Sequence, residues 1–326
     1  MWNRSGILME KLPFVQVLSG RADRQLEMLA GVPHSVAHSA DGLGGSAREA
    51  EAILYWAGSR ELLRAAFVAA PNVRWVHSRS AGLDNMLFPE LVESNVLLTN
   101  GSGVFSPSLG EFALAAILYF AKDFRRMLRN QMAGRWEQFD VEEIAGQTVG
   151  IVGYGDIGRA VAGRVHAMGM RVVALKRHAP AAPDPLIAQF YGPGELNAML
   201  GVCDYVVVAA PLTAETRHMI SDAAFAAMKS NAVVINIGRG PVIDQAALVR
   251  ALAEKRIKGA GLDVFEQEPI PAGDPIYQLE NLLLSPHCAD HTKDWLDQAM
   301  RFFLEQYKRF ARGEPLENVV EKHLGY

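Results

Sequence analysis

The chain has 326 residues, of which 50% are hydrophobic and 21% are charged, a balance that is typical of a globular protein of about two domains and excludes a disordered one. The formal net charge is −4 without a long basic run, and the longest apolar stretch, residues 112–121, is about half of a membrane span, so we expect neither nucleic acid nor membrane as a partner. The two cysteines, Cys203 and Cys288, have no metal-binding spacing, and the N-terminal residues lack a secretory signal pattern, so we expect a cytoplasmic protein.

Short apolar runs alternate with helical patterns along the chain. Strands are predicted at residues 14–18, 52–56, 73–78, 96–99, 148–152, 171–175, 205–209, 232–237, 259–264 and 282–285. These runs are rich in Val, Ile and Leu and barely alternate with polar residues, as in parallel strands that are buried on both faces. The repeated order of strand and helix predicts doubly wound parallel α/β sheets.

A segment rich in Gly and Ser, residues 100–108, divides the chain into two parts. An apolar helix is predicted directly after it, from Leu109 to about Gln131, and its first half has no polar face, so it must be buried against another surface. A cluster of Pro and Ala, residues 178–185, is predicted to be a surface loop. The last predicted element is a helix near residues 295–312.

Three glycines in the pattern GxGxxG, namely Gly153, Gly155 and Gly158, follow a predicted strand directly and open the next helix. The first permits a tight turn, the second lets the backbone approach a pyrophosphate, and the third allows close packing of helix and strand. The N-terminus of the helix then faces the anion. A turn without a ligand is the alternative, but the order of strand, turn and helix favours a dinucleotide-binding site.

The following predicted strand ends in Lys176, Arg177 and His178. Sites for NAD place an acidic residue here, about 20 residues after the glycines, where it binds the ribose 2′-hydroxyl. This sequence has no carboxylate at that point but two fixed cations, which would attract a 2′-phosphate. The pattern therefore favours NADP over NAD, with a solvated basic turn as the alternative.

Further motifs follow in order along nearly the whole chain. They are SRSAGLDNM (78–86), the glycine loop, PLTAETRHMI (211–220), INIGRGPVID (235–244), GLDVFEQEP (261–269) and SPHCAD (285–290). With these motifs in register, the sequence resembles the D-isomer-specific 2-hydroxyacid dehydrogenase family, and in its features most of all the glyoxylate/hydroxypyruvate reductases.

The resemblance implies two doubly wound, Rossmann-like domains with the active site in the cleft between them. One would be a flavodoxin-like substrate-binding domain of residues 1–101 and 292–326, and the other a dinucleotide-binding domain of residues 102–291. The apolar helix that begins at Leu109 would lie in the interface of a homodimer.

By the same resemblance, the catalytic residues are Arg239, Glu268 and His287. The chemistry supports these residue types, because a planar guanidinium can hold the carboxylate and the ketone of a 2-oxo acid by paired hydrogen bonds. Hydride transfer to the ketone carbon makes a developing alkoxide that needs a proton, and histidine is the usual donor near neutral pH. A carboxylate on the other ring nitrogen orients the imidazole and favours its charged form.

The resemblance also implies the remaining contacts. Cofactor contacts are expected from Gly153, Gly155, Asp156, Ile157, Gly158, Lys176, Arg177, Pro211, Thr216, Ile237 and Asp263. Substrate contacts are expected from Ala81, Gly82, Arg239 and His287, with no metal site. Asp263 would hold the nicotinamide carboxamide or, alternatively, only cap its strand.

One position departs from the family pattern, because Asp290 stands where Gly or Ala is usual, three residues after His287. Its charge could interact with the carboxamide or influence His287. Another open position is Trp56, which could line a substrate pocket or belong to the core.

These features predict hydride transfer between NADP(H) and a small 2-oxo acid or D-2-hydroxy acid, such as glyoxylate or hydroxypyruvate. An NAD-dependent enzyme similar to D-3-phosphoglycerate dehydrogenase is an alternative that the Lys176–Arg177 pair disfavours, and a formate dehydrogenase is disfavoured by Glu268. A dinucleotide-sensing corepressor is the alternative from another class, because the family includes corepressors that keep the three catalytic residues.

Overall fold

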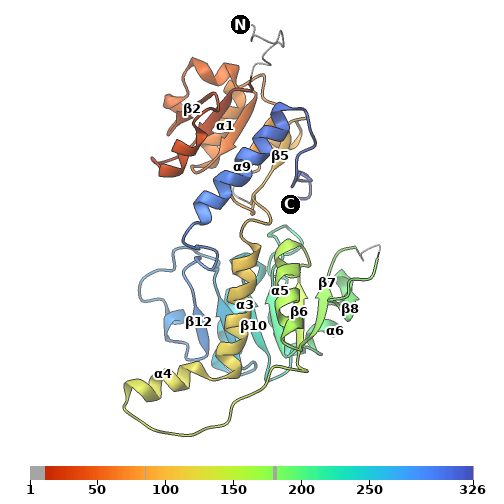
Figure 1. Ribbon diagram of the computed structural model, residues 1–326. Helices are drawn as coiled ribbons and strands as arrows, with labels where there is room; N and C mark the ends of the chain where they lie inside the picture. Colours follow the sequence, from red (N-terminus) through yellow and green to blue (C-terminus); the bar gives the residue numbers. More distant parts are fainter. Residues whose placement is uncertain (1–11, 85, 179–181, 326) are drawn as a thin grey trace. The chain divides into compact units, whose positions relative to one another are not determined.

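The computed structural model describes residues 12–84, 86–178 and 182–325. These residues form two compact units, one of which contains the chain up to Val104 together with the residues from Asp294 on, while the other runs from Phe105 to Lys293 (Figure 1). Each unit is built on an all-parallel sheet. The predicted fold class, α/β with two doubly wound parallel sheets, is therefore confirmed.

In its described residues, the first unit has a five-stranded sheet in the order β2-β1-β3-β4-β5. Its strands are β1 (Val15–Leu18), β2 (His34–Ala37), β3 (Ala52–Tyr55), β4 (Trp75–Ser78) and β5 (Leu97–Thr99). Its helices are α1 (Arg60–Ala69), α2 (Pro89–Val92) and α9 (Trp295–Ala311), and its 3-10 turns are η1 (Arg24–Leu29), η2 (Ala40–Gly42) and η3 (Gly45–Glu49). The buried rings of Trp75 and Phe303 stack with centroids 5.4 Å apart, so α9, the predicted C-terminal helix, packs on this sheet.

The described part of the second unit has a seven-stranded sheet in the order β12-β11-β10-β9-β6-β7-β8. Its strands are β6 (Thr148–Val152), β7 (Arg171–Leu175), β8 (Gln189–Tyr191), β9 (Tyr205–Val208), β10 (Val233–Asn236), β11 (Gly259–Leu262) and β12 (Leu282–Leu284). Its helices and 3-10 turns are α3 (Ser106–Ala121), α4 (Phe124–Met132), α5 (Asp156–Ala167), η4 (Pro193–Glu195), α6 (Leu196–Leu200), α7 (Asp222–Ala227), η5 (Gly240–Val242), α8 (Gln245–Ala253) and η6 (Pro275–Gln278). The strand order reverses between β6 and β9, and open α/β sheets bind ligands at the carboxyl ends of the strands there.

The single helix predicted from Leu109 to about Gln131 is wrong, because the chain forms two helices there, α3 and α4. They are separated at Asp123, whose φ of 49° is left-handed and ends the helical path. The Asp123 side chain accepts a hydrogen bond from the backbone N–H of Arg126 at 3.3 Å and so caps α4. Asp123, which caps the second helix, thus divides the predicted single helix into α3 and α4.

The apolar face of α3 is used within its own unit. A Cβ added at Gly110 would lie 3.0 Å from the carbonyl oxygen of Ala160, so α3 and α5 approach each other closely, as Figure 1 also shows. On the sheet side, a Cβ at Gly259 of β11 would lie 2.4 Å from the ring of Phe120. The hydrophobic character of α3 is therefore largely explained by packing on its own sheet. Among the helices of the described residues, none has the length and apolarity that crossing a bilayer requires.

Candidate active site

The glycine loop connects β6 to α5. Gly153 has a φ of 94°, and an added Cβ would lie 2.6 Å from Ala210, while a Cβ at Gly158 would lie 2.5 Å from the carbonyl oxygen of Gly153. Packing of the protein itself therefore requires these two glycines. Gly155 differs, because its φ is −100° and an added Cβ would meet no atom within 4 Å. The open space beside Gly155, at the N-terminus of α5, fits the pyrophosphate of a dinucleotide.

The other residues that the sequence implies for the cofactor follow the carboxyl ends of neighbouring strands. They are Asp156 and Ile157 after β6, Lys176 and Arg177 after β7, Pro211 and Thr216 after β9, Ile237 after β10 and Asp263 after β11. Asp156 accepts a hydrogen bond from the hydroxyl of Ser106 in the first turn of α3, and the Thr216 hydroxyl donates to the carbonyl of Pro211 at 2.6 Å. The sheet thus brings this group to one edge.

The two cations after β7 have different surroundings. The guanidinium of Arg177 forms an ion pair with Glu215, which lies in the loop after β9. The ammonium of Lys176 lies 5.9 Å from the centre of the Tyr154 ring, within the glycine loop. The sequence alone suggested no carboxylate near these cations, and the structure corrects this, because the fold brings one from a distant loop.

Tyr154 also ties the glycine loop to the segment after β7. Its hydroxyl donates to Asp184 at 2.8 Å, and the same carboxylate oxygen forms an ion pair with Arg159 of α5. Burial and the neighbouring carboxylate of Asp184 raise the pKa of Tyr154 to about 12. Tyr154 is therefore a neutral hydrogen-bond donor at physiological pH.

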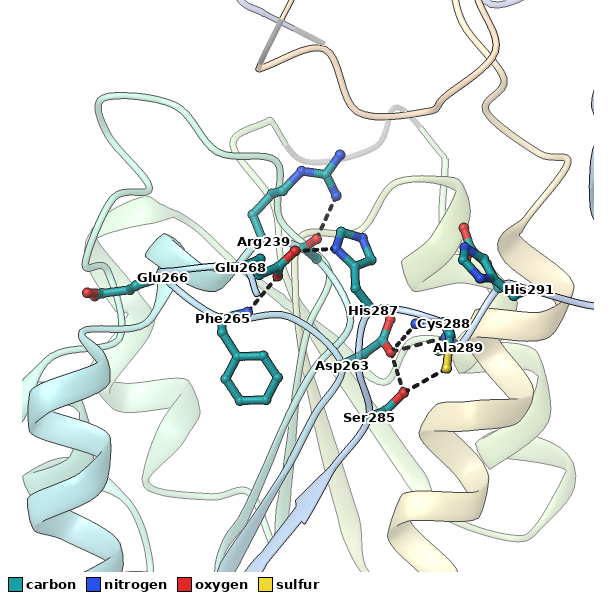
Figure 2. A network of polar contacts seen from close by, with 12 residues as sticks. Arg239, Asp263, Phe265, Glu266, Glu268, Ser285, His287, Cys288, Ala289 and His291 are labelled. Atoms are coloured by element: carbon teal, nitrogen blue, oxygen red, sulfur yellow. Dashed lines mark hydrogen bonds and ion pairs between the residues drawn. The ribbon is translucent and has the colours of Figure 1, made fainter. Parts of the chain in front are cut away.

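Arg239 lies in a turn that the backbone and Asn236 hold. The Asn236 side chain accepts from the N–H of Gly238 at 3.1 Å and donates to the carbonyl of Arg239 at 3.0 Å. A Cβ on Gly240 would lie only 1.9 Å from the backbone of Phe265, so the loops after β10 and β11 touch there. This contact places the half-buried Arg239 beside the loop that carries Glu268 (Figure 2).

His287 and Glu268 form a close pair. The Nδ1 atom of His287 lies 2.6 Å from Oε2 of Glu268, whose other oxygen accepts from the N–H of Phe265 at 2.8 Å. The imidazole side chain is 45% exposed, and its contact with Glu268 uses only Nδ1, which leaves Nε2 for exchange of a proton. Glu266, the other acidic residue of this motif, points away in Figure 2 and pairs with His218 at 2.8 Å.

Asp263 organises the loop that carries His287. It is 1% exposed, and its Oδ1 atom accepts hydrogen bonds from the Ser285 hydroxyl at 2.6 Å and from the N–H groups of Cys288 at 2.9 Å and Ala289 at 3.1 Å. Its backbone carbonyl accepts from the N–H of His287, a residue with a left-handed φ of 52°. Asp263 therefore holds the turn in which His287 lies, which is more than the strand cap that the sequence left as an alternative.

Asp290 follows in the same loop. Its Oδ1 atom is buried and has no hydrogen-bond partner among the described residues, and Nε2 of His291 lies 3.7 Å away. Burial raises the pKa of Asp290, while the nearby His291 and His287 oppose this rise. The carboxyl group that departs from the family pattern is therefore partly desolvated beside His287.

The predicted substrate contacts Ala81 and Gly82 belong to the first unit, in the loop after β4. The carbonyl of Ala81 accepts from the side chain of Asn100 at 2.7 Å. Trp56 is 1% exposed, and its indole N–H donates to Asp23 at 2.9 Å while the guanidinium of Arg79 lies 5.1 Å from its ring centre. Trp56 is thus packed within the first unit.

Two carboxylates of this site, Glu215 and Asp184, were absent from the residues that we expected from the sequence. Each reaches its partner from another loop, Glu215 to Arg177 and Asp184 to Tyr154. No motif in the sequence indicated either carboxylate. The contacts follow from the observed sheet, in which β7 and β9 both flank β6 and so place their following loops on either side of the glycine loop.

Comparisons with known proteins found similarities in sequence and in fold. Residues 114–289 match the family model described as the NAD binding domain of D-isomer specific 2-hydroxyacid dehydrogenases. A glyoxylate reductase of Korarchaeum cryptofilum is 36% identical over 264 residues, which are 79% of this chain and 79% of that protein.

Solved structures resemble the whole described fold. A D-isomer specific 2-hydroxyacid dehydrogenase from Xanthobacter autotrophicus Py2, in complex with NADPH and MES, has a TM-score of 0.83 and 31% identity and covers 96% of this chain and 99% of its own. An NADPH-dependent glyoxylate/hydroxypyruvate reductase from Sinorhizobium meliloti, in complex with NADP and sulfate, has a TM-score of 0.80 and 26% identity, with coverage of 97% and 100%.

Proposed function

The chain belongs to the D-isomer-specific 2-hydroxyacid dehydrogenase family and is an NAD(P)-dependent enzyme of this family, and from this premise we propose that it reduces glyoxylate or hydroxypyruvate with NADPH. The observation that carries the proposal is the pair of His287 and Glu268, 2.6 Å apart, beside the loop of Arg239. The named activities of the relative from Korarchaeum cryptofilum and the structure from Sinorhizobium meliloti support this choice of substrate.

Each residue has a defined task in the proposed reaction. A bound nicotinamide dinucleotide supplies the hydride for the ketone carbon. Arg239 holds the substrate carboxylate and polarises the ketone with its planar guanidinium. Since Nδ1 of His287 faces Glu268, the proton for the ketone oxygen comes from Nε2. Glu268 orients the ring through its contact with Nδ1, and Asp263 holds the turn in which the histidine lies.

A panel of 2-oxo acids tests the proposed substrate. Glyoxylate, hydroxypyruvate, pyruvate, 2-oxobutyrate and 3-phosphohydroxypyruvate are compared by kcat/KM with a fixed concentration of NADPH. We expect the highest values for glyoxylate or hydroxypyruvate. A preference for 3-phosphohydroxypyruvate would contradict the proposal, and the absence of turnover with every acid together with tight binding of the dinucleotide would indicate a sensor.

The second prediction concerns the choice of cofactor. We expect kcat/KM for NADPH to exceed that for NADH by about tenfold or more, because contacts of Lys176 and Arg177 to a 2′-phosphate would be charge-assisted. Steady-state rates with glyoxylate and both cofactors measure the ratio. Comparable efficiencies for the two cofactors would contradict the prediction.

The third prediction is a homodimer. The helix α4 and the segment after it carry exposed apolar side chains. In Figure 1 the ribbon of this helix and segment lies at the margin of the second unit. Among these side chains, Met132 is 90% exposed and Trp136 is 95% exposed. Because large apolar side chains at such exposure are typical of a surface that a partner covers, we expect light scattering to give about twice 35.6 kDa.

A double substitution, Met132→Glu with Trp136→Glu, should shift this mass toward that of a monomer, because it places charges on the proposed interface. Val68→Glu is the matched control, since Val68 is 68% exposed in α1 of the other unit. A wild-type mass near 35.6 kDa at micromolar concentration would rule out the dimer.

A further inference from the structure

The ion pair of Arg177 and Glu215 joins two loops on either side of the glycine loop. Arg177 follows β7, Glu215 lies in the loop after β9, and β6 lies between these two strands in the sheet. The side chain of Arg177 is 32% exposed, whereas that of Glu215 is 71% exposed. The carboxylate is thus mostly in contact with solvent, and the guanidinium with which it pairs is partly so.

The loop of Glu215 is ordered by its own hydrogen bonds. The Thr216 hydroxyl donates to the carbonyl of Pro211 at 2.6 Å and accepts from the N–H of Thr213 at 2.8 Å, and the N–H of Arg217 donates to the carbonyl of Thr213 at 3.1 Å. These bonds fix the backbone on both sides of Glu215. The carboxylate therefore extends from an ordered stretch of backbone, and it forms the ion pair with Arg177.

A carboxylate at this place acts on the two cofactors differently. It carries the same sign of charge as a 2′-phosphate and occupies the guanidinium that the phosphate would use. A 2′-hydroxyl carries no charge, so NADH meets no such repulsion, and a carboxylate is also the group that NAD sites commonly place here.

We propose that Glu215 is a specificity-determining residue that competes with the 2′-phosphate for Arg177 and so narrows the preference for NADP over NAD. This inference rests on the proposed cofactor preference. No acidic residue stands at the end of β7, but the loop after β9 supplies one. Its carboxylate opposes the attraction of a 2′-phosphate to the basic residues that follow β7.

Binding of nucleotide fragments tests the proposal without turnover. The probes are adenosine 2′,5′-bisphosphate, which has the 2′-phosphate, and 5′-AMP, which lacks it, and their Kd values are measured by calorimetry. In Glu215→Gln we expect the bisphosphate to bind about fivefold more tightly, with the Kd of 5′-AMP changed less than about twofold. Fluorescence titration should give the same direction for NADPH relative to NADH.

A matched control separates this effect from a general change of charge. Glu254 is 61% exposed and lies 3.1 Å from Arg256, which is 32% exposed like Arg177. Since Glu254 follows α8 and precedes β11, it lies toward the amino ends of the strands, at the edge opposite the glycine loop. Glu254→Gln should leave both Kd values unchanged.

The variant Arg177→Gln distinguishes failure of this inference from failure of the cofactor proposal. If Arg177→Gln does not weaken binding of the bisphosphate relative to that of 5′-AMP, the proposed phosphate site is wrong. The inference about Glu215 is then wrong as well. If Arg177→Gln weakens binding of the bisphosphate but Glu215→Gln has the Kd values of the wild type, only the role of Glu215 is overturned. In the double variant that combines Arg177→Gln with Glu215→Gln, the substitution of Glu215 should no longer tighten binding of the bisphosphate. If it still does, competition for Arg177 is also overturned.

Discussion

Replacement of His287 by alanine is expected to lower kcat by about 10²–10⁴-fold, the usual range for the loss of a general acid. The reason is that the alkoxide formed by hydride transfer would then take its proton from water. The Kd of NADPH should stay nearly the same, because the His287 ring pairs with Glu268 and the loop itself is held by Asp263. Single-turnover rates and fluorescence titration measure the two quantities separately.

The variant Glu268→Gln tests the partner of His287, because it keeps the size of the side chain and removes its charge. Since Glu268 orients the His287 ring across 2.6 Å, we expect Glu268→Gln to lower kcat, with a smaller loss than in His287→Ala. A His287→Ala enzyme with nearly wild-type kcat would remove His287 from the mechanism, and a wild-type kcat in Glu268→Gln would contradict the role of Glu268.

Most of the fold follows from local patterns in the sequence. The central strands were predictable because they are buried on both faces and therefore consist of continuous runs of Val, Ile and Leu, as in β9 and β10. The strands β2 (His34–Ala37) and β8 (Gln189–Tyr191) escaped prediction. Both lie at the edge of a sheet and pair with only one neighbouring strand. Such a strand can be short and partly polar, so it lacks the continuous apolar run that identifies a central strand.

The candidate site divides in a similar way. The sequence could indicate Arg239, Glu268 and His287 as candidate catalytic residues, because each stands in a motif at the end of a predicted strand. It could not indicate the pair of Arg177 and Glu215, since residues 38 positions apart meet only through the order of strands in the sheet. Nor could it indicate that Oδ1 of Asp263 holds the His287 turn, because that contact depends on the backbone path of one loop.

The last prediction concerns Arg239, whose replacement by lysine keeps the positive charge and removes the planar fork. We expect kcat/KM to fall by about 10- to 100-fold, the size of one lost charge-assisted hydrogen bond. KM should rise because the substrate carboxylate is held less well, and kcat should fall because the ketone is polarised less in the transition state. Arg256→Lys, at the opposite edge of the sheet, controls for the exchange itself and should leave both constants unchanged. A raised KM with unaltered kcat would restrict Arg239 to binding the carboxylate, whereas wild-type values for both constants would exclude it from the site.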